Sequence, residues 1–286
     1  MKSSRWLLAP TAALLVLLTS CGGHSTASAP PAPSYSTAAL VGSWRLFGGN
    51  NSSTGSALSI SMGVVGAQIH GRAANSLACS NGVSEGGFDM AMDGEIAADG
   101  SFEMKNAAAD DVLFTIKGNA PFSGATSWSG SYTLSSHAGS ICTIQQSGNF
   151  NATQLPSVTG TYSGSVTGFA SGQTTSVTIS TTLTQGSFTS NSIIPETPYY
   201  YTPVTANVTA VGASCFTSAA IGDTVPVLPP EQVMGNVVQL NLATDTGGML
   251  SVQGYFTDDT EKTMEFQGSV LGDKCAQRFD GTLTRQ

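Results

Sequence analysis

Two glutamates in one expected β-hairpin have the spacing that comes nearest to a catalytic pair. The stretch DGEIAADGSFEMK, residues 93–105, alternates polar and apolar residues on both sides of a turn. A three-residue loop ending on a left-handed Gly100 pairs Glu95 with Glu103. The same register pairs Ile96 with Phe102 and so separates a polar face from an apolar one, whereas a two-residue turn would mix Glu95 with Phe102.

Opposed carboxylates of this kind have two interpretations. A glycosidase uses two carboxyl groups as acid and as base or nucleophile. Alternatively, Glu95 and Glu103 lie on a solvated strand face, where opposed like charges are only mildly unfavourable. We expect the solvated face, because the apolar face of this hairpin fills the core and the polar face is left to water.

The histidines form no recognisable catalytic or metal-binding pattern. His24 lies in a proline-rich segment, His70 on an expected strand and His137 in a polar turn. A Ser/His/Asp site needs a group that orients the histidine, and the sequence shows no such trio and no phosphate loop. The stretch TDDTEK, residues 257–262, lacks the ligand spacing of a calcium loop and is typical of a hairpin turn. We therefore expect no cofactor, no metal and no enzymatic activity.

The most unusual stretch is PETPYYYTPV, which places Tyr199, Tyr200 and Tyr201 between prolines. Tyrosine offers a broad apolar face and a polar tip, which suits contacts with proteins or sugars. These tyrosines are our candidate partner-binding residues. The alternative is a loop that packs over the end of its own domain. A second long loop, Ile221–Met234, ends in a candidate short helix around Pro230–Met234.

Five cysteines are present, an odd number. No C-x-x-C or His/Cys cluster occurs, so a zinc site is not expected. Four of the cysteines could form disulfides in an oxidising compartment, and the fifth, Cys21, stands apart from them near the N-terminus.

Residues 1–20 have the features of a secretory signal peptide. Lys2 and Arg5 precede an apolar run, Trp6–Leu18, that is too short for a transmembrane helix. Residues 21–37 follow as small, polar and proline-rich sequence, which predicts a disordered tether.

Leu18-Thr19-Ser20-Cys21 resembles the lipobox of bacterial lipoproteins. This resemblance implies cleavage before Cys21, acylation of its sulfur and acylation of the new N-terminus. Several acyl chains at roughly 0.8 kcal/mol per buried methylene anchor a protein durably. Gly22 is not the aspartate that retains such lipoproteins at the inner membrane, which implies the outer membrane of a Gram-negative envelope.

The net charge of the chain makes some classes of binding partner unfavourable. Without the leader, which holds two of the ten basic residues, the chain has 8 basic and 18 acidic residues, a net charge of −10. Nucleic acids and anionic headgroups are poor partners for such a surface.

The remainder of the chain repeats itself. GSW at 42–44 matches GTY at 160–162, and WSGSY at 128–132 matches FQGSV at 266–270. Glycine and an apolar residue follow Cys142 at +6 and +8 (Gly148, Phe150), as they follow Cys275 (Gly281, Leu283). We therefore expect two domains, residues 38–155 and 156–286.

The repeat also predicts the disulfides. It aligns Cys79 with Cys215 and Cys142 with Cys275, at intervals of 63 and 60 residues. Four cysteines allow three connectivities. Only Cys79–Cys142 with Cys215–Cys275 keeps each bridge within one repeat.

Apolar residues recur with a period of two almost throughout. Strict alternation in 126–134, 175–184 and 238–242 indicates half-buried antiparallel strands. The fold class is therefore all-β, with two tandem antiparallel β-barrel or barrel-like sandwich domains. Their core-facing residues are mainly Val, Ile, Leu, Met and Phe, which fill a small barrel and leave little cavity.

Gly42-Ser43-Trp44 and Gly160-Thr161-Tyr162 resemble the G-x-W opening of calycin barrels, the lipocalin and avidin superfamily, and TSWSGSY is similar to a mid-barrel strand of the avidin-like group. The resemblance implies that Arg285, on the last strand, packs over Tyr162. The end of the first half, NATQL, has no such basic residue, and the polar ligand positions of avidins find no match after Trp44. More broadly, the chain resembles bacterial lipoproteins with Ser/Thr-rich strands and paired cysteines, a resemblance that implies no activity.

These patterns favour a membrane-anchored envelope lipoprotein that acts as a non-catalytic binding or scaffold module. Its partner would be a protein or a glycan, with the loops of the second half as the contact surface. Two alternatives remain open: a calycin-like carrier of a small ligand, and a glycan hydrolase that uses Glu95 and Glu103.

Overall fold

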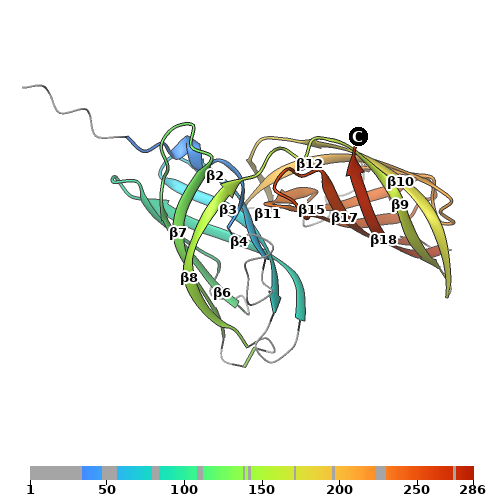
Figure 1. The fold of residues 1–286 in the computed structure, drawn as a ribbon, viewed down its shortest axis with the longest axis horizontal. Helices are drawn as coiled ribbons and strands as arrows, with labels where there is room; N and C mark the ends of the chain where they lie inside the picture. Colours follow the sequence, from blue (N-terminus) through green and yellow to red (C-terminus); the bar gives the residue numbers. More distant parts are fainter. Residues whose placement is uncertain are drawn as a thin grey trace, which may run out of the picture. The chain divides into compact units, whose positions relative to one another are not determined.

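The computed structural model describes residues 34–46, 57–78, 84–107, 112–137, 139–140, 143–170, 172–194, 197–222, 230–272 and 275–286 (Figure 1). The leader, Cys21, His24, the tether up to residue 33, Cys79 and Cys142 lie outside these residues. Among the residues that are described, no helix is long and apolar enough to cross a membrane.

The first domain is a closed barrel of antiparallel strands. A short 3-10 helix, η1 (Thr37–Leu40), precedes its first strand. Each strand pairs with the next along the chain, and β8 pairs with β1 to close the ring. The strands are β1 (Gly42–Arg45), β2 (Ala57–Val65), β3 (Gln68–Ala78), β4 (Ser84–Ile96), β5 (Ser101–Lys105), β6 (Val112–Asn119), β7 (Ser127–Ser136) and β8 (Gln145–Gln154).

The second domain is also a closed eight-stranded barrel, because β10 pairs with both β9 and β12. Two short elements lie off the ring: β11 (Thr189–Ile194) pairs with β12, and β14 (Gln232–Met234) pairs with β12 and β15. The ring consists of β9 (Gly160–Ala170), β10 (Gln173–Gln185), β12 (Thr197–Val211), β13 (Ser218–Ala220), β15 (Val237–Thr244), β16 (Met249–Phe256), β17 (Thr263–Gly272) and β18 (Cys275–Arg285). The all-β prediction with two domains is thus confirmed, and both domains are barrels.

The two barrels open with the same local arrangement, which supports the repeat. The indole Nε1 of Trp44 donates to the carbonyl oxygen of Leu40 at 2.9 Å, and the hydroxyl of Tyr162 donates to that of Val158 at 3.0 Å. Both aromatic side chains are fully buried. The guanidinium of Arg285 lies 5.9 Å from the centre of the Tyr162 ring, as the calycin resemblance implied.

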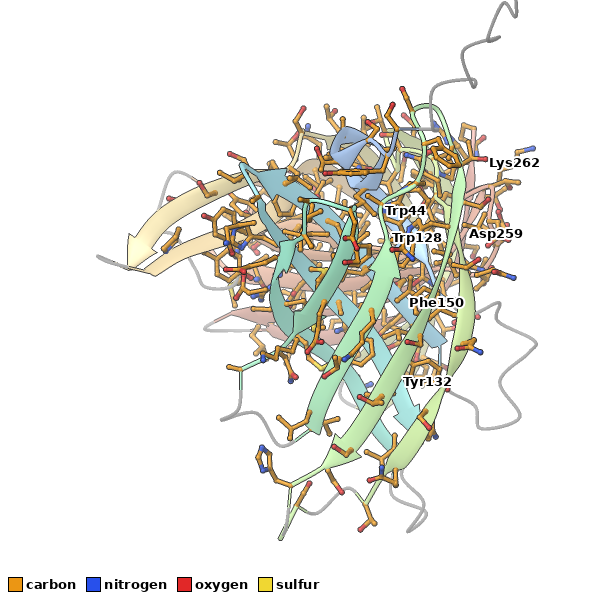
Figure 2. All side chains as sticks on the ribbon, turned by 90° about the vertical axis from the view of Figure 1, so that its left-hand side faces the viewer. Trp44, Trp128, Tyr132, Phe150, Asp259 and Lys262 are labelled. Carbon is orange, nitrogen blue, oxygen red and sulfur yellow. A yellow bond between two sulfur atoms is a disulfide. The ribbon has the colours of Figure 1, made fainter. Side chains whose placement is uncertain are left out.

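Aromatic rings fill the interior of the first barrel next to its opening. The ring of Trp128 contacts Trp44 edge-on at 6.1 Å between centroids and Phe150 at 5.1 Å (Figure 2). These rings belong to one buried cluster that also includes Phe114 and Ile116, both at 0% exposure. The barrel interior is therefore occupied by the protein's own side chains.

Two details of the sequence prediction are wrong. Gly130 pairs with Phe150, whereas its repeat partner Gly268 pairs with Phe279, so Phe150 corresponds to Phe279 and not to Leu283. A shift of four residues leaves the inward and outward faces of a strand unchanged, which is why the pattern misled. The expected helix at Pro230–Met234 is also incorrect, since Gln232–Met234 forms β14 and pairs on both sides.

The disulfide predicted for the second barrel, Cys215–Cys275, is confirmed. Cys215 and Cys275 form a disulfide across 60 residues, with their Cα atoms 5.5 Å apart. The predicted partner bridge, Cys79–Cys142, lies outside the described residues and stays a prediction.

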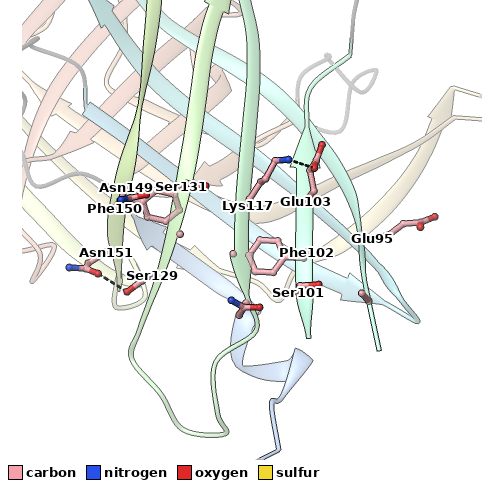
Figure 3. Close-up of a pocket in the computed structure, with 14 residues that line it drawn as sticks. Glu95, Ser101, Phe102, Glu103, Lys117, Ser129, Ser131, Asn149, Phe150 and Asn151 are labelled. Carbon is pink, nitrogen blue, oxygen red and sulfur yellow. Dashed lines mark hydrogen bonds and ion pairs between the residues drawn. The ribbon is translucent and has the colours of Figure 1, made fainter. Parts of the chain in front are cut away.

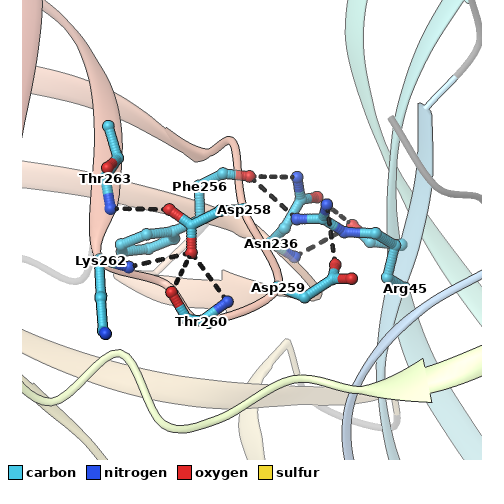
Figure 4. A network of polar contacts seen from close by, with 9 residues as sticks. Arg45, Asn236, Phe256, Asp258, Asp259, Thr260, Lys262 and Thr263 are labelled. Atoms are coloured by element: carbon cyan, nitrogen blue, oxygen red, sulfur yellow. Dashed lines mark hydrogen bonds and ion pairs between the residues drawn. The ribbon is translucent and has the colours of Figure 1, made fainter. Parts of the chain in front are cut away.

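Polar contacts also join the two barrels. Arg45, on β1, donates from Nη2 to the carbonyl oxygen of Phe256 at 3.1 Å and forms an ion pair with Asp259 at 2.9 Å. Asn236 donates to the same Phe256 carbonyl at 2.9 Å and accepts a hydrogen bond from Ser59 at 2.6 Å (Figure 4). Arg45 is 8% exposed, and these partners engage its two terminal nitrogens, whereas its Nε has no hydrogen-bond partner among the described residues.

Candidate binding surface on the first barrel

The outer wall of the first barrel carries a wide, open hollow of about 940 Å³ that crosses the hairpins of β4 to β8 (Figure 3). Hydroxyl, amide and charged side chains line it, together with two phenylalanines and two glycines. We call this surface the first-barrel hollow. Its lining residues include Glu95, Ser101, Glu103, Lys117, Asn119, Ser129, Ser131, Asn149 and Asn151.

The floor of the hollow is one row of residues across four strands. Phe102 pairs with Gly118, Gly118 with Gly130, and Gly130 with Phe150. A side chain at Gly130 would place its Cβ 2.7 Å from the Phe150 ring, and one at Gly118 would lie 2.9 Å from the Trp128 ring. The two glycines therefore let the aromatic rings pack directly beneath the backbone, a common reason for glycine within a strand.

Polar residues flank this floor in register. Glu103 lies opposite Lys117, Lys117 opposite Ser131, and Ser131 opposite Asn149. The charges of the first two cancel, since Lys117 Nζ lies 2.7 Å from a carboxylate oxygen of Glu103. This row presents a neutral series of donors and acceptors to solvent.

A second polar row lies on the other side of the floor, closer to the β4–β5 turn and the β6–β7 loop. Ser101 pairs with Asn119 on one side of the hollow, and Ser129 pairs with Asn151 on the other. The hydroxyl of Ser129 donates to the side-chain oxygen of Asn151 at 2.6 Å. That bond engages the amide oxygen of Asn151, and the NH₂ group of the same side chain can act as a donor.

The structure confirms the predicted register of this hairpin. Glu95 pairs with Glu103 and Ile96 with Phe102, and Gly100 has φ +85°. The hydrogen bond from Lys117 is the main reason that the pKa of Glu103 lies below its usual value. Glu95 instead accepts a hydrogen bond from Gln68 at 3.1 Å. A glycosidase acid needs a raised pKa, so the environment of Glu103 is the opposite of what a general acid requires.

The three tyrosines lie on β12 and β11 packs beside them. Tyr200 stacks on His70 of the first barrel at 3.6 Å between ring centres, and the guanidinium of Arg72 lies 4.2 Å from the Tyr199 ring. Burial raises the pKa of Tyr199 to about 12. All three rings are only partly exposed, so much of their area is already engaged by the protein itself. Their role toward a partner stays a prediction.

The histidines have the following surroundings. His70 Nδ1 lies 2.7 Å from Asp93 Oδ1, in addition to its stacking on Tyr200. His137 is exposed. Within the described part of the chain, no group of three or more His, Cys, Asp and Glu side chains could hold a metal ion.

The second barrel carries a smaller hollow of about 310 Å³ at the repeat-related position. Its floor contains Gly268 next to Phe279, as Gly130 lies next to Phe150 in the first barrel. Its lining is again amide- and hydroxyl-rich: Gln239, Asn241, Ser251, Gln253, Gln267, Ser269 and Arg278. The sequence signal for both hollows was the matched WSGSY and FQGSV, whose polar residues flank a shared glycine.

Comparisons with models of known protein families and with curated proteins gave no match. The site is therefore interpreted from its own geometry.

Proposed function

We propose that this protein is a non-catalytic binding module, held at the cell envelope by a lipid on Cys21, that binds a neutral glycan in the first-barrel hollow. The single observation that carries the proposal is the paired polar rows on either side of the glycine-containing floor. The anchor and the outer-membrane location rest on the lipobox resemblance.

The chemistry of the rows matches a sugar chain. Each sugar hydroxyl both donates and accepts a hydrogen bond, and serine and asparagine side chains offer both functions. In the row formed by Glu103, Lys117, Ser131 and Asn149, the charges of Glu103 and Lys117 neutralise each other, because Lys117 Nζ lies 2.7 Å from the carboxylate. Glu95 is then the one charged residue of the lining without a cation beside it, and a hydrogen-bonding surface with this slight negative charge favours an uncharged polymer over a nucleic acid.

Because the hollow is open, it is better suited to binding a stretch of a polymer than to enclosing a small ligand. It runs across several strands on the outside of the barrel (Figure 3). The inside holds fully buried side chains such as Trp44, Phe114 and Ile116. This packing speaks against the calycin-like carrier, and the lowered pKa of Glu103 speaks against its use as the general acid of a hydrolase.

The proposal predicts that wild-type protein binds purified envelope oligosaccharides and that the Asn149→Ala/Asn151→Ala variant binds them about 30-fold more weakly. Each lost hydrogen bond costs about 1 kcal/mol, and about 1.4 kcal/mol is tenfold in affinity. Titration calorimetry of the full chain measures the difference.

Asn207→Ala is the matched control, because Asn207 is an exposed asparagine on β12, outside the hollow. It should leave the affinity unchanged. Equal affinities for all three proteins, or no heat with any envelope oligosaccharide, would count against the hollow as the binding site.

A further inference from the structure

The end of the first barrel at which the described chain begins is apolar and nearly uncharged. It consists of residues 34–41, the β2–β3 turn, the β4–β5 turn and the β6–β7 loop, and we call it the tether end. Large exposed apolar side chains lie on three of these segments: Tyr35 (36% exposed), Val41 (38%), Val65 (54%) and Phe122 (55%).

These segments are held together by backbone contacts. Tyr35 forms an antiparallel bridge with Phe122, and the amide of Ser36 donates to the carbonyl of Pro121 at 2.8 Å. The hydroxyl of Tyr35 donates to the Ala98 carbonyl at 3.1 Å. The exposed apolar groups are therefore fixed on a joined surface and do not lie on separate loose loops.

Charge is scarce at this end. Within residues 34–41, 64–68, 97–100 and 120–126, Asp99 is the one charged residue. The whole chain, by contrast, carries 18 acidic and 10 basic residues. An end with this composition can approach lipid headgroups with little electrostatic or desolvation cost.

The length of chain before this end places it near a bilayer. Twelve residues, 22–33, separate Cys21 from Ser34. Covalent geometry limits the reach of twelve residues to about 43 Å, at most about 3.6 Å per residue. The tether end is thus the part of the barrel that an acylated Cys21 keeps closest to the membrane.

We propose that the tether end docks on the lipid bilayer, with Phe122, Tyr35 and Val65 in the headgroup region. The inference rests on the proposed lipid anchor. Aromatic side chains favour this region of a membrane, and apolar contact adds to the anchoring by acyl chains. Ser101 and Asn119 directly adjoin the tether end, so docking would hold a glycan in the first-barrel hollow close to the membrane surface.

Tryptophan fluorescence in brominated vesicles tests this inference. The mature, acylated full-length protein is reconstituted into phosphatidylethanolamine/phosphatidylglycerol vesicles with or without dibrominated phosphatidylcholine. Phe122→Trp is expected to lose at least half of its added emission in the brominated vesicles. Trp44 and Trp128 are buried and common to all variants, so the protein without the substitution supplies the background.

Phe169→Trp is the control, since Phe169 is also exposed (42%) and lies at the end of β9 on the second barrel. It should not be quenched. Co-flotation of the protein with vesicles but no quenching of Phe122→Trp would overturn the docking and leave the lipid anchor standing. Quenching at residue 169 in place of residue 122 would also overturn it. Failure to co-float would remove the anchor and the docking together.

Discussion

Replacing Glu261 by glutamine is expected to stabilise the protein at pH 9 by on the order of 3 kcal/mol and to change its stability little at pH 4. Burial is the main reason that the pKa of Glu261 rises from 4.5 to about 8 in the folded protein. Arg45 and Arg285 oppose this rise, and Asp258 adds to it.

The direction of the pH effect follows from proton binding. Between pH 4.5 and about 8 the folded protein keeps the Glu261 proton, whereas the unfolded chain releases it. The contribution of protonated Glu261 to folding stability therefore falls as the pH rises through this window, and this contribution is lost above the folded pKa. Glutamine cannot ionise, so the variant lacks this loss.

The surroundings of Glu261 explain why the residue behaves in this way. It lies in the turn between β16 and β17, it is fully buried, and neither carboxylate oxygen has a hydrogen-bond partner among the described residues. Its backbone is held at φ +51°, and its carbonyl accepts a hydrogen bond from the Tyr162 hydroxyl at 3.2 Å. An ionised carboxylate in such a place is costly.

Urea unfolding at pH 4, 6.5 and 9 measures the effect, with Glu265→Gln as the control. Glu265 is an exposed glutamate on the adjoining strand β17, so its replacement removes the same charge at a solvated position. A Glu261→Gln variant whose stability varies with pH as steeply as that of the wild type would show that the carboxyl is not the group responsible.

Removal of the second-barrel disulfide is expected to destabilise the protein by an amount similar in size to the change predicted for Glu261→Gln at pH 9. Cys215→Ala/Cys275→Ala should lower the free energy of unfolding by about 4 kcal/mol, because the bridge closes a loop of 60 residues. Alanine is the suitable replacement, since Cys215 is 3% exposed within the core of the barrel. Denaturant unfolding followed by circular dichroism measures the loss.

A reducing agent provides the complementary comparison. Reduction should destabilise the wild type at least as much as the double substitution does. A further loss on reducing the double variant would reveal the predicted Cys79–Cys142 bridge. Unchanged stability in the double variant would contradict a structural role for Cys215–Cys275.

Local patterns in the sequence predicted much of the fold. Alternation of apolar residues identified the strands, because the side-chain period of a strand is two and one face is buried. The position of Gly100 fixed the Glu95–Glu103 register, since a left-handed residue was needed there. The resemblance to calycins placed Arg285 correctly over Tyr162.

Features that depend on longer loops or on contacts between distant strands could not be predicted. The hollow needs Gly118 beside Gly130, and that register is set by the β6–β7 loop, residues 120–126. The stretch TDDTEK was correctly expected to form a polar turn, in which the carboxylate of Asp258 accepts a hydrogen bond from the Thr260 amide at 2.8 Å. Yet nothing in its composition indicated that Glu261 turns inward. Nor did the tyrosine run indicate that Tyr200 stacks on His70.

Binding of a glycan to the outer wall of the first barrel is tested most directly by amide chemical-shift mapping of the full chain, titrated with an envelope oligosaccharide. We expect the largest shifts at Ser129, Ser131, Asn149 and Asn151, with the buried interior of the barrel unaffected. Shifts confined to the segment around Tyr199–Tyr201, or to the residues inside the barrel, would contradict it.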